Sequence, residues 1–259
     1  MKADTRRKHS GPSQTAELQK GPDHGRGPIP DLSQNRILAE LSDGEIDRLK
    51  PHFRYVQLHD RQMLRTENEP MVHVYFPTAG MISSVVVMAN GFTIEVNIIG
   101  REGMLGASML LGYDGAPGSV SFVQVRGAAF RIKASDCRSA FDGKGRLQPI
   151  VHRYLGAQWA QLARSAACNR LHTQSQRFAR RLLMAMDRVG PEFRMTHELL
   201  AETLGSRRPT VTVEAQKLQE AGIIEYRRGT MKILKRKSLE LITCECYRRT
   251  DLDGFLKDS

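Results

Sequence analysis

Arginines and lysines gather in one short stretch of the sequence, where they could bind a polyanion. Between Gly205 and Lys237, nine basic residues stand against three glutamates. The nine are Arg207, Arg208, Lys217, Arg227, Arg228, Lys232, Lys235, Arg236 and Lys237. More than half of the formal net charge of +11 falls in this stretch. A guanidinium can donate two hydrogen bonds to guanine, and any of these cations can bind phosphate. The pattern indicates a nucleic acid as partner.

The residues around these cations predict the elements that position them. Thr196 is a good N-cap for the helical segment HELLAETL, and Gly205 supplies the turn after it. Ser206 is the expected cap of a second helix, which has Pro209 in its first turn. A short hairpin, IIEYRRGTMKIL, follows. This order is typical of a winged helix-turn-helix, whose second helix lies in the major groove of duplex DNA while the hairpin holds the backbone.

The exposed end of the second helix and the hairpin hold the predicted DNA contacts. They are Ser206, Arg207, Arg208, Thr210, Thr212, Arg227, Arg228 and Lys232. Arg207 and Arg208 are placed to read a base, with a phosphate contact as the alternative for either. Arg227 and Arg228, beside Gly229, are placed to bind the phosphate backbone. The core shared by the two helices is predicted from apolar residues at helical spacing. These are Leu199, Leu200, Leu204, Val211, Ala215 and Leu218.

The segment from residue 53 to residue 132 predicts strands. Short apolar or alternating runs recur there (FRYVQL, VHVYFP, MISSVVVMA, FTIEVNII, SFVQV and AAFRI), separated mainly by glycines. Asn90-Gly91 predicts a type I′ hairpin turn between the third and fourth runs. Many short strands of this kind are typical of a jelly roll or small barrel. Ahead of them the sequence is helical in period, and Ser42 with Glu45 forms a capping-box pattern.

A long helix is predicted over residues 147–171, with two adjacent apolar stripes. One stripe holds Val151, Leu155, Trp159, Leu162 and Ala166, and the other holds Ile150, Tyr154 and Ala157. Two stripes predict contacts on two sides, one with the barrel and one with a second subunit, while a single broad core face is the alternative. A further amphipathic helix follows and is stopped by Gly190-Pro191. Its apolar face is Phe178, Leu182, Ala185 and Val189.

The predicted fold class is α+β, with a β jelly roll, a long dimerisation helix and a winged helix-turn-helix in that order. The predicted boundaries are a disordered tail over 1–31, the jelly roll over 32–146, the dimer helix over 147–172, the DNA-binding domain over 173–250 and a second tail over 251–259. A chain of 259 residues is long enough for two such cores.

Composition predicts where the protein works. No apolar run is long enough to cross a bilayer, and the N-terminal segment lacks the apolar core of a secretory signal. Four cysteines in this length do not make a disulfide framework, so a reducing compartment is expected. We expect a cytoplasmic protein whose partner is double-stranded DNA and not a membrane.

The order of these parts resembles the Crp/Fnr family of bacterial transcription regulators over about residues 32–250. The resemblance is specific in LLAETLGSRRPTVT and LQEAGIIEYRRG, and weaker in HVYFPTAG and GREGMLG. GREGMLG together with ACNRLH and CECY is similar to a subgroup whose effector is unassigned. The resemblance implies a cyclic-nucleotide-binding-like barrel, a homodimer on a two-fold related operator, and RNA polymerase as a further partner.

The barrel departs from the family pattern at the effector site. The resemblance places that site at Gly103, Met104, Leu105 and Gly106, where nucleotide-binding members carry a ribose-binding Glu. Their phosphate-binding arginine would fall near residues 118–121, and no arginine stands there. Because a cyclic phosphate would lose its main charge-assisted partner, we expect no cyclic AMP binding. The first cysteine is Cys137, so the N-terminal iron–sulfur cluster of the oxygen-sensing branch is not expected either. The cofactor stays unassigned.

The predicted recognition helix departs from the family pattern at two positions. Arg208 matches the guanine-reading arginine of the family. Pro209 stands where other members carry a base-contacting Glu, and Val213 replaces a later contact Arg. The resemblance therefore implies the docking mode of the family on a different operator sequence.

Two pairs of potential metal ligands lie outside these motifs. Cys168 and His172 share one helical face, and Cys244 and Cys246 stand near the C-terminus. If the last helix folds back, the four form a Cys₃His zinc set, and the protein is a metal- or redox-responsive regulator. The interpretation that the spacing favours is a packing role for Cys168 and a neutral or redox-reactive pair at Cys244 and Cys246.

Two other classes of protein share parts of the pattern. A jelly-roll metalloenzyme needs several histidines inside the barrel, and residues 53–132 contain only His59 and His73, so we expect no enzyme. A sensory dimer that does not bind DNA is the remaining alternative. It predicts that neutralising the basic hairpin together with Arg207 and Arg208 leaves the affinity for DNA unchanged.

Overall fold

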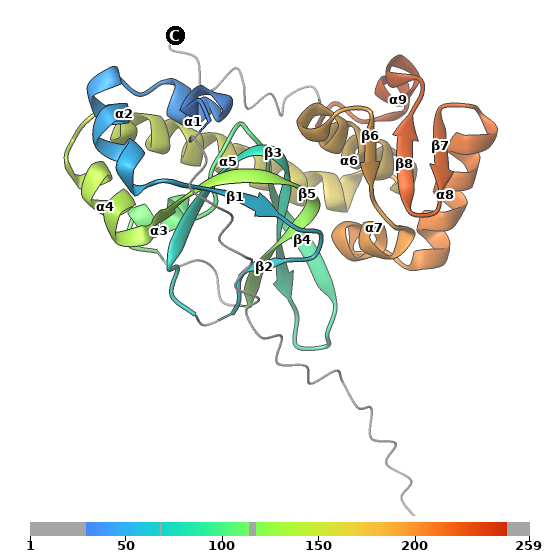
Figure 1. The fold of residues 1–259 in the computed structure, drawn as a ribbon. Coiled ribbons are helices and arrows are strands. Elements are labelled where there is room, and N and C mark those ends of the chain that lie inside the picture. The colour runs from blue at the N-terminus through green and yellow to red at the C-terminus, as the bar shows by residue number, and fades with distance from the viewer. Residues whose placement is uncertain (1–29, 68, 114–117, 248–259) are drawn as a thin grey trace, which may run out of the picture.

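The computed structural model describes residues 30–67, 69–113 and 118–247, which form a sheet-rich domain, a long helix and a smaller C-terminal domain (Figure 1). The C-terminal domain, orange and red in Figure 1, lies beside the sheet. Nearly all of the predicted tail over 1–31 and the whole tail over 251–259 lie outside the described residues. Among the described residues, no helix combines the length and the hydropathy needed to span a bilayer.

Short helices precede the sheet, as the period of this segment predicts. They are the 3₁₀ turns η1 (Leu32–Gln34) and η2 (Lys50–His52) and the helices α1 (Arg36–Ala39) and α2 (Asp43–Leu49). The predicted capping box of α2 is present, with the Ser42 amide donating to Glu45 Oε2 at 3.1 Å. Asn35 caps α1, and its buried side chain also donates to the carbonyls of Pro77 and Gly103, 2.9 Å away in each case. These bonds fix the helices to the roll.

The sheet-rich domain is one antiparallel five-stranded sheet that curls into a roll (Figure 1). Its strands are β1 (Arg54–Leu58), β2 (Met63–Arg65), β3 (His73–Val87), β4 (Thr93–Ile99) and β5 (Ser119–Lys133). The strand order is β1-β5-β3-β4, with β2 also on β5. The pairing of β3 with β5 shifts register three times between Pro77 and Ile82. Register shifts of this kind bend strands, so two 15-residue strands can serve both ends of the roll.

The hairpin between β3 and β4 does not have the predicted turn. Gly91 has a φ of +81°, whereas Asn90 is not among the residues with positive φ, so the turn is not type I′. Instead, the Gly91 amide donates to Met88 O at 2.8 Å, and the Phe92 amide donates to Asn90 Oδ1 at 3.1 Å. The Asn side chain closes the turn itself, a local alternative to positive φ that Asn offers.

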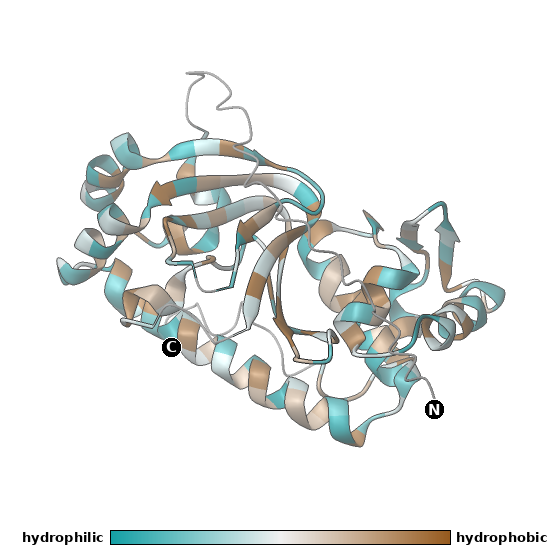
Figure 2. Ribbon diagram, turned by 90° about the horizontal axis from the view of Figure 1, so that it is seen from below, coloured by the Kyte–Doolittle hydropathy of each residue, from teal (hydrophilic) through white to brown (hydrophobic). Residues whose placement is uncertain are grey.

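The long helix α5 (Leu147–Leu171) covers the roll together with α3 (Ala107–Leu110) and α4 (Ala134–Asp142). Its buried face holds Ile150, Val151, Tyr154, Ala157, Gln161 and Cys168. The predicted stripe that contains Trp159 is open beyond its buried first residue, Val151: Trp159 is 75% exposed, and Leu155 and Leu162 are only half-buried. Figure 2 shows α5 along one side of the molecule, with hydrophobic bands among polar ones. One side of α5 thus packs on the roll, and the predicted contact of the other side stays a prediction.

The C-terminal domain begins with α6 (Gln174–Val189), whose predicted apolar face is buried apart from half-buried Val189 and whose C-cap is Gly190. It continues with β6 (Glu192–Arg194), α7 (His197–Leu204), α8 (Arg208–Glu220), β7 (Ile224–Arg227), β8 (Thr230–Ile233) and α9 (Arg236–Ile242). The three strands form a second sheet in the order β6-β8-β7. The sequence pattern predicted the β7–β8 hairpin but not β6, which has only three residues.

Candidate DNA-binding surface and a cysteine–histidine cluster

The turn between α7 and α8 forms largely as the local sequence dictates. Thr196 Oγ1 accepts the Leu199 amide at 3.2 Å, and Gly205 ends α7 in the left-handed conformation, with a φ of +57°. The predicted cap of α8 is wrong: the N-cap is Arg207, without a side-chain bond. The Ser206 hydroxyl instead donates to Gln174 Oε1 at 2.9 Å. Ser206 thus ties the turn to the start of α6, a non-local contact that spacing cannot show.

Helix α8 has one buried face and one open face. Val211, Ala215 and Leu218 are buried with the α7 leucines, as predicted. Arg207, Arg208, Pro209 and Thr210 are exposed at its N-terminal end. Among the described residues, no carboxylate forms an ion pair with Arg207 or Arg208. Their guanidinium groups are therefore available to an external anion.

Thr212 differs from the other predicted contacts because its hydroxyl is engaged inside the domain. The group is half-buried, donates to Arg208 O at 3.1 Å and lies 3.1 Å from His197 Nδ1. The His197 ring stacks on Tyr226 of the wing, with ring centroids 4.0 Å apart. Burial, reinforced by the charge of Arg208, lowers the pKa of His197. Thr212 and His197 thus connect α8 to strand β7 of the hairpin.

The wing presents its basic tip in a tight turn. Arg228 and Gly229 both have positive φ, +50° and +81°, which is the signature of a type I′ turn. Arg227 and Arg228 are exposed, whereas Lys232 lies 3.9 Å from Glu192 on the neighbouring strand β6. Positive φ at a non-glycine residue is uncommon, and here it places Arg228 within the two-residue turn of the hairpin.

The segment predicted for an effector borders a small cavity in the roll. Met104, Leu105 and Gly106 line a volume of about 150 Å³, whereas Gly103 does not. A Cβ atom on Gly103 would lie 2.2 Å from the Tyr154 hydroxyl, so this glycine permits close packing on α5. The other lining residues include Arg65, Ser84, Asn97, Ser119, Ser121 and Gln158.

An arginine does reach this cavity, although none stands in the segment 118–121. Arg65 comes from the neighbouring strand β2, and its Nη1 donates to Ser119 Oγ at 2.9 Å. The pairing of β2 with β5 brings it there, and only the register of the sheet reveals that contact. Drug-sized ligand sites usually enclose at least ~300 Å³, so the cavity suits a smaller group.

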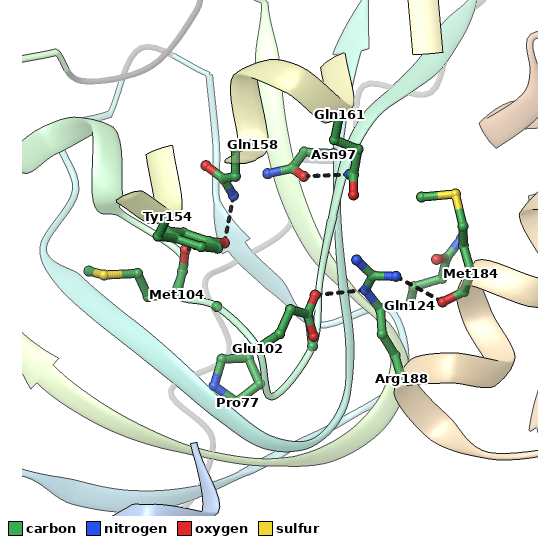
Figure 3. Close-up of polar contacts among 12 residues, drawn as sticks. Pro77, Asn97, Glu102, Met104, Gln124, Tyr154, Gln158, Gln161, Met184 and Arg188 are labelled. Atoms are coloured by element: carbon green, nitrogen blue, oxygen red, sulfur yellow. Dashed lines mark hydrogen bonds and ion pairs between the residues drawn. The ribbon is translucent and has the colours of Figure 1, made fainter. Parts of the chain in front are cut away.

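Two buried ion pairs join the C-terminal domain to the roll. On α6, Arg188 Nε lies 2.7 Å from Glu102 Oε1, and its Nη1 donates to Met184 O (Figure 3). Two turns earlier, Arg181 Nε lies 2.7 Å from Glu95 Oε1 on β4. All four side chains are at most 8% exposed. Figure 3 shows the Arg188–Glu102 ion pair beside two hydrogen bonds of α5, Tyr154–Gln158 and Asn97–Gln161.

Strand β4 also touches the turn of the helix-turn-helix. A Cβ atom on Gly205 would lie 3.2 Å from Ile94 Cδ1, so the strand and the turn are in contact. A recess of about 450 Å³ lies beside this contact, between the β3–β4 hairpin and α7, and Arg208 lines it with Phe92 and Glu202. The base of the predicted recognition helix therefore rests on the sensor-like domain.

Four potential metal ligands from two distant segments meet at the end of α5. Cys168, His172, Cys244 and Cys246 each place one ligand atom within 4.8 Å of all the others. All three cysteines are buried and form no disulfide. Burial raises the pKa of the Cys168 thiol to about 12. The structure thus joins the two pairs that the sequence left apart.

Residues 176–242 match the family model of the Crp-like helix-turn-helix domain. This segment runs from the first turn of α6 to the end of α9 and contains every predicted DNA contact. The C-terminal domain therefore belongs to a class of DNA-binding modules. No curated protein matches the chain by sequence at a significant level.

Solved structures extend the likeness beyond the C-terminal domain. A Crp/Fnr family transcriptional regulator from Eubacterium rectale is 16% identical, with a TM-score of 0.64 over 83% of this chain and 99% of that one. FixK2 from Bradyrhizobium japonicum is 15% identical, with a TM-score of 0.61 over 74% and 98%. CLP from Xanthomonas campestris, described as a c-di-GMP responsive global regulator, is 16% identical, with a TM-score of 0.58 over 74% and 99%. The C-terminal domain thus matches the Crp-like helix-turn-helix model, and the chain shares the fold of these solved regulators.

Proposed function

We propose that the chain is a homodimeric regulator that binds a specific DNA sequence through the N-terminal end of α8 and the tip of the wing. The observation that carries the proposal is the exposed, unpaired pair Arg207 and Arg208 at the start of a helix whose other face is buried. Such an end can enter the major groove, and the arginines can donate to guanine. Arg227 and Arg228 lie on the wing and would hold phosphates on the same duplex.

The open face of α5 supports the dimer. Trp159 is 75% exposed, and Leu155, Leu162 and Ala166 stand on the same stripe of a 25-residue helix. Exposure of a large aromatic side chain to water at the centre of such a stripe is unfavourable. A second copy of α5 packed against this face would cover it on both subunits, because a two-fold interface repeats the same patch.

The cavity in the roll supports an effector other than cyclic AMP. The buried Met104 side chain lines the cavity, and it lies in the segment where the family resemblance would place a ribose-binding Glu. Arg65 also lines the cavity, and its guanidinium donates a hydrogen bond to Ser119. A small anion that accepts hydrogen bonds from Arg65, Ser84 or Ser121 fits both the size and the polarity of this space.

Genome-wide mapping of bound sites tests the proposal. The wild-type chain should enrich one motif with two-fold symmetric half-sites about one helical turn apart. The double variant Arg207→Ala, Arg208→Ala should lose that enrichment, while Trp159→Glu should lose it together with the dimer in sedimentation. If the wild type and the arginine variant recover all DNA sequences equally, the result supports the alternative, a sensory dimer that does not bind a specific DNA sequence.

A further inference from the structure

The cluster of Cys168, His172, Cys244 and Cys246 has the dimensions of a metal coordination shell. Cys168 Sγ and Cys244 Sγ are 3.6 Å apart, and Cys246 Sγ lies 3.7 Å from His172 Nδ1. A tetrahedral zinc ion with ordinary bond lengths separates two sulfurs by about 3.8 Å and a sulfur from a nitrogen by about 3.6 Å. A disulfide needs sulfurs about 2.05 Å apart, so the sulfurs are spaced for a shared ion and not for a covalent bond.

The imidazole is already oriented as a ligand. His172 turns Nδ1 toward Cys246, and its Nε2 lies 3.3 Å from Glu245 Oε2. A metal-bound histidine usually donates its second ring N–H to a carboxylate, which fixes the tautomer that leaves the first nitrogen free for the metal. The carboxylate here comes from the residue between the two cysteines. The Cys-x-Cys segment therefore supplies two ligands and the group that orients a third.

A buried arginine beside the cluster would be stabilised by a negatively charged group. Arg180 is 8% exposed and lines one recess together with Cys168, and its Nε has no hydrogen-bond partner. Among the described residues, no carboxylate forms an ion pair with it; its only polar partner is the Ser165 hydroxyl, 3.2 Å from Nη2. A buried guanidinium without a counter-ion is costly. Zinc with three thiolates and one neutral imidazole carries a net charge of −1, which would offset this arginine.

We propose that these four side chains bind one Zn²⁺ ion as a closed Cys₃His site, with Glu245 supporting His172. All four positions are filled by protein, which makes the role structural and not catalytic. The ion would join the C-terminal end of α5 to the segment after α9. Residues 173–243 lie between the two ligand pairs, so the whole helix-turn-helix domain becomes a loop closed at its base. A closed base fixes the joint between the long helix and α6.

The test is metal analysis of the full-length protein, purified without chelators. One zinc per chain is expected, and it should be lost in Cys168→Ser and His172→Gln. The matched control is Cys137→Ser, which alters a buried cysteine on α4 outside the cluster and should keep its zinc. Because a serine variant can also misfold, His172→Cys provides a second measure. It preserves four ligands and should retain stoichiometric zinc.

The weaker variant Glu245→Gln measures the support of the histidine. Loss of an outer-shell carboxylate usually lowers metal affinity by about 10–100-fold, so competition with a chromogenic chelator should show that shift while the stoichiometry stays at one. Cobalt added to the zinc-free protein should give the visible bands of a tetrahedral thiolate site. Removal of the metal should lower the midpoint of thermal unfolding, and added zinc should restore it.

Several results would overturn the proposal. Metal-free protein with four titratable thiols would make the cluster a packing contact. Two missing thiols would make it a disulfide, and iron with visible absorbance would make it a different cofactor. Zinc that persists unchanged in Cys168→Ser would be bound elsewhere. None of these outcomes bears on DNA binding, which the motif mapping tests independently.

Discussion

Arginines on two faces of the C-terminal domain differ in their burial and in their ion-pair partners. On α6, Arg181 and Arg188 are buried against the roll, and each has a carboxylate 2.7 Å away. On α8 and the wing, Arg208 and Arg228 are exposed, and no carboxylate among the described residues pairs with them. Net charge therefore overstates the surface available to DNA. The pairing of each arginine decides whether it serves as a structural bond or as a contact for a ligand.

The largest effect is expected at the buried face. Glu95→Gln leaves the Arg181 guanidinium buried without its counter-ion, and removal of one partner of such a pair costs about 3–5 kcal/mol. The free energy of unfolding, measured in urea, should fall by that amount. The double variant Arg181→Met, Glu95→Leu removes both charges and should recover most of the loss. A single variant as stable as the wild type would show that this pair does not hold α6 on the roll.

The next effect is expected at the start of α8. Arg208→Ala should weaken binding to the cognate site by about 1–3 kcal/mol and relax discrimination at one base pair. Fluorescence anisotropy with the mapped motif and with single-base variants of it measures both. Stability should be unchanged, because no carboxylate in the described part of the chain forms an ion pair with this side chain. If Arg208→Ala weakens binding to cognate and random DNA alike, the residue contacts phosphate.

A smaller and uniform effect is expected at the wing. Arg228→Ala should weaken binding to all sequences equally and reduce the slope of log K against log salt by about 0.9, the value for one lost phosphate contact. Arg228→Lys keeps the charge and should keep the slope. A loss of sequence discrimination in Arg228→Ala would transfer base reading from α8 to the wing.

The smallest effect concerns pH. Since burial lowers the pKa of His197 in the folded chain, the unfolded chain takes up a proton first as the pH falls below about 6.5. Stability should decrease from that pH until the pH has passed below the folded-state pKa, and remain constant below it. His197→Phe keeps a ring against Tyr226 and should remove this component of the pH dependence. Identical pH profiles of the two proteins would contradict it.

Features with local causes could be predicted from the sequence. The N-cap at Thr196, the left-handed Gly205 and the position of Pro209 each follow from the residue itself, and the order of elements follows from them. The Crp-like domain model confirms the helix-turn-helix class of the C-terminal domain, and the neighbouring folds confirm the fold class. The individual DNA contacts stay predictions.

Features that depend on distant segments could not be predicted. Ser206 is a good cap by type, but Gln174 competes for its hydroxyl across the fold. The arginine of the cavity comes from β2, through the register of the sheet. The meeting of Cys168 and Cys244 depends on how α9 returns to the end of α5, which no spacing of residues encodes.

Strand β4 contacts both the proposed effector cavity and the turn before the predicted recognition helix. Asn97 lines the cavity, and Ile94 touches the turn that carries α8. Three residues of a strand span about 10 Å. The pairing of β4 with β3 shifts register between Glu95 and Asn97, so an irregularity lies between the two contacts. Under the proposed function, we expect a ligand in the cavity to act on α8 through this one strand, within a single subunit.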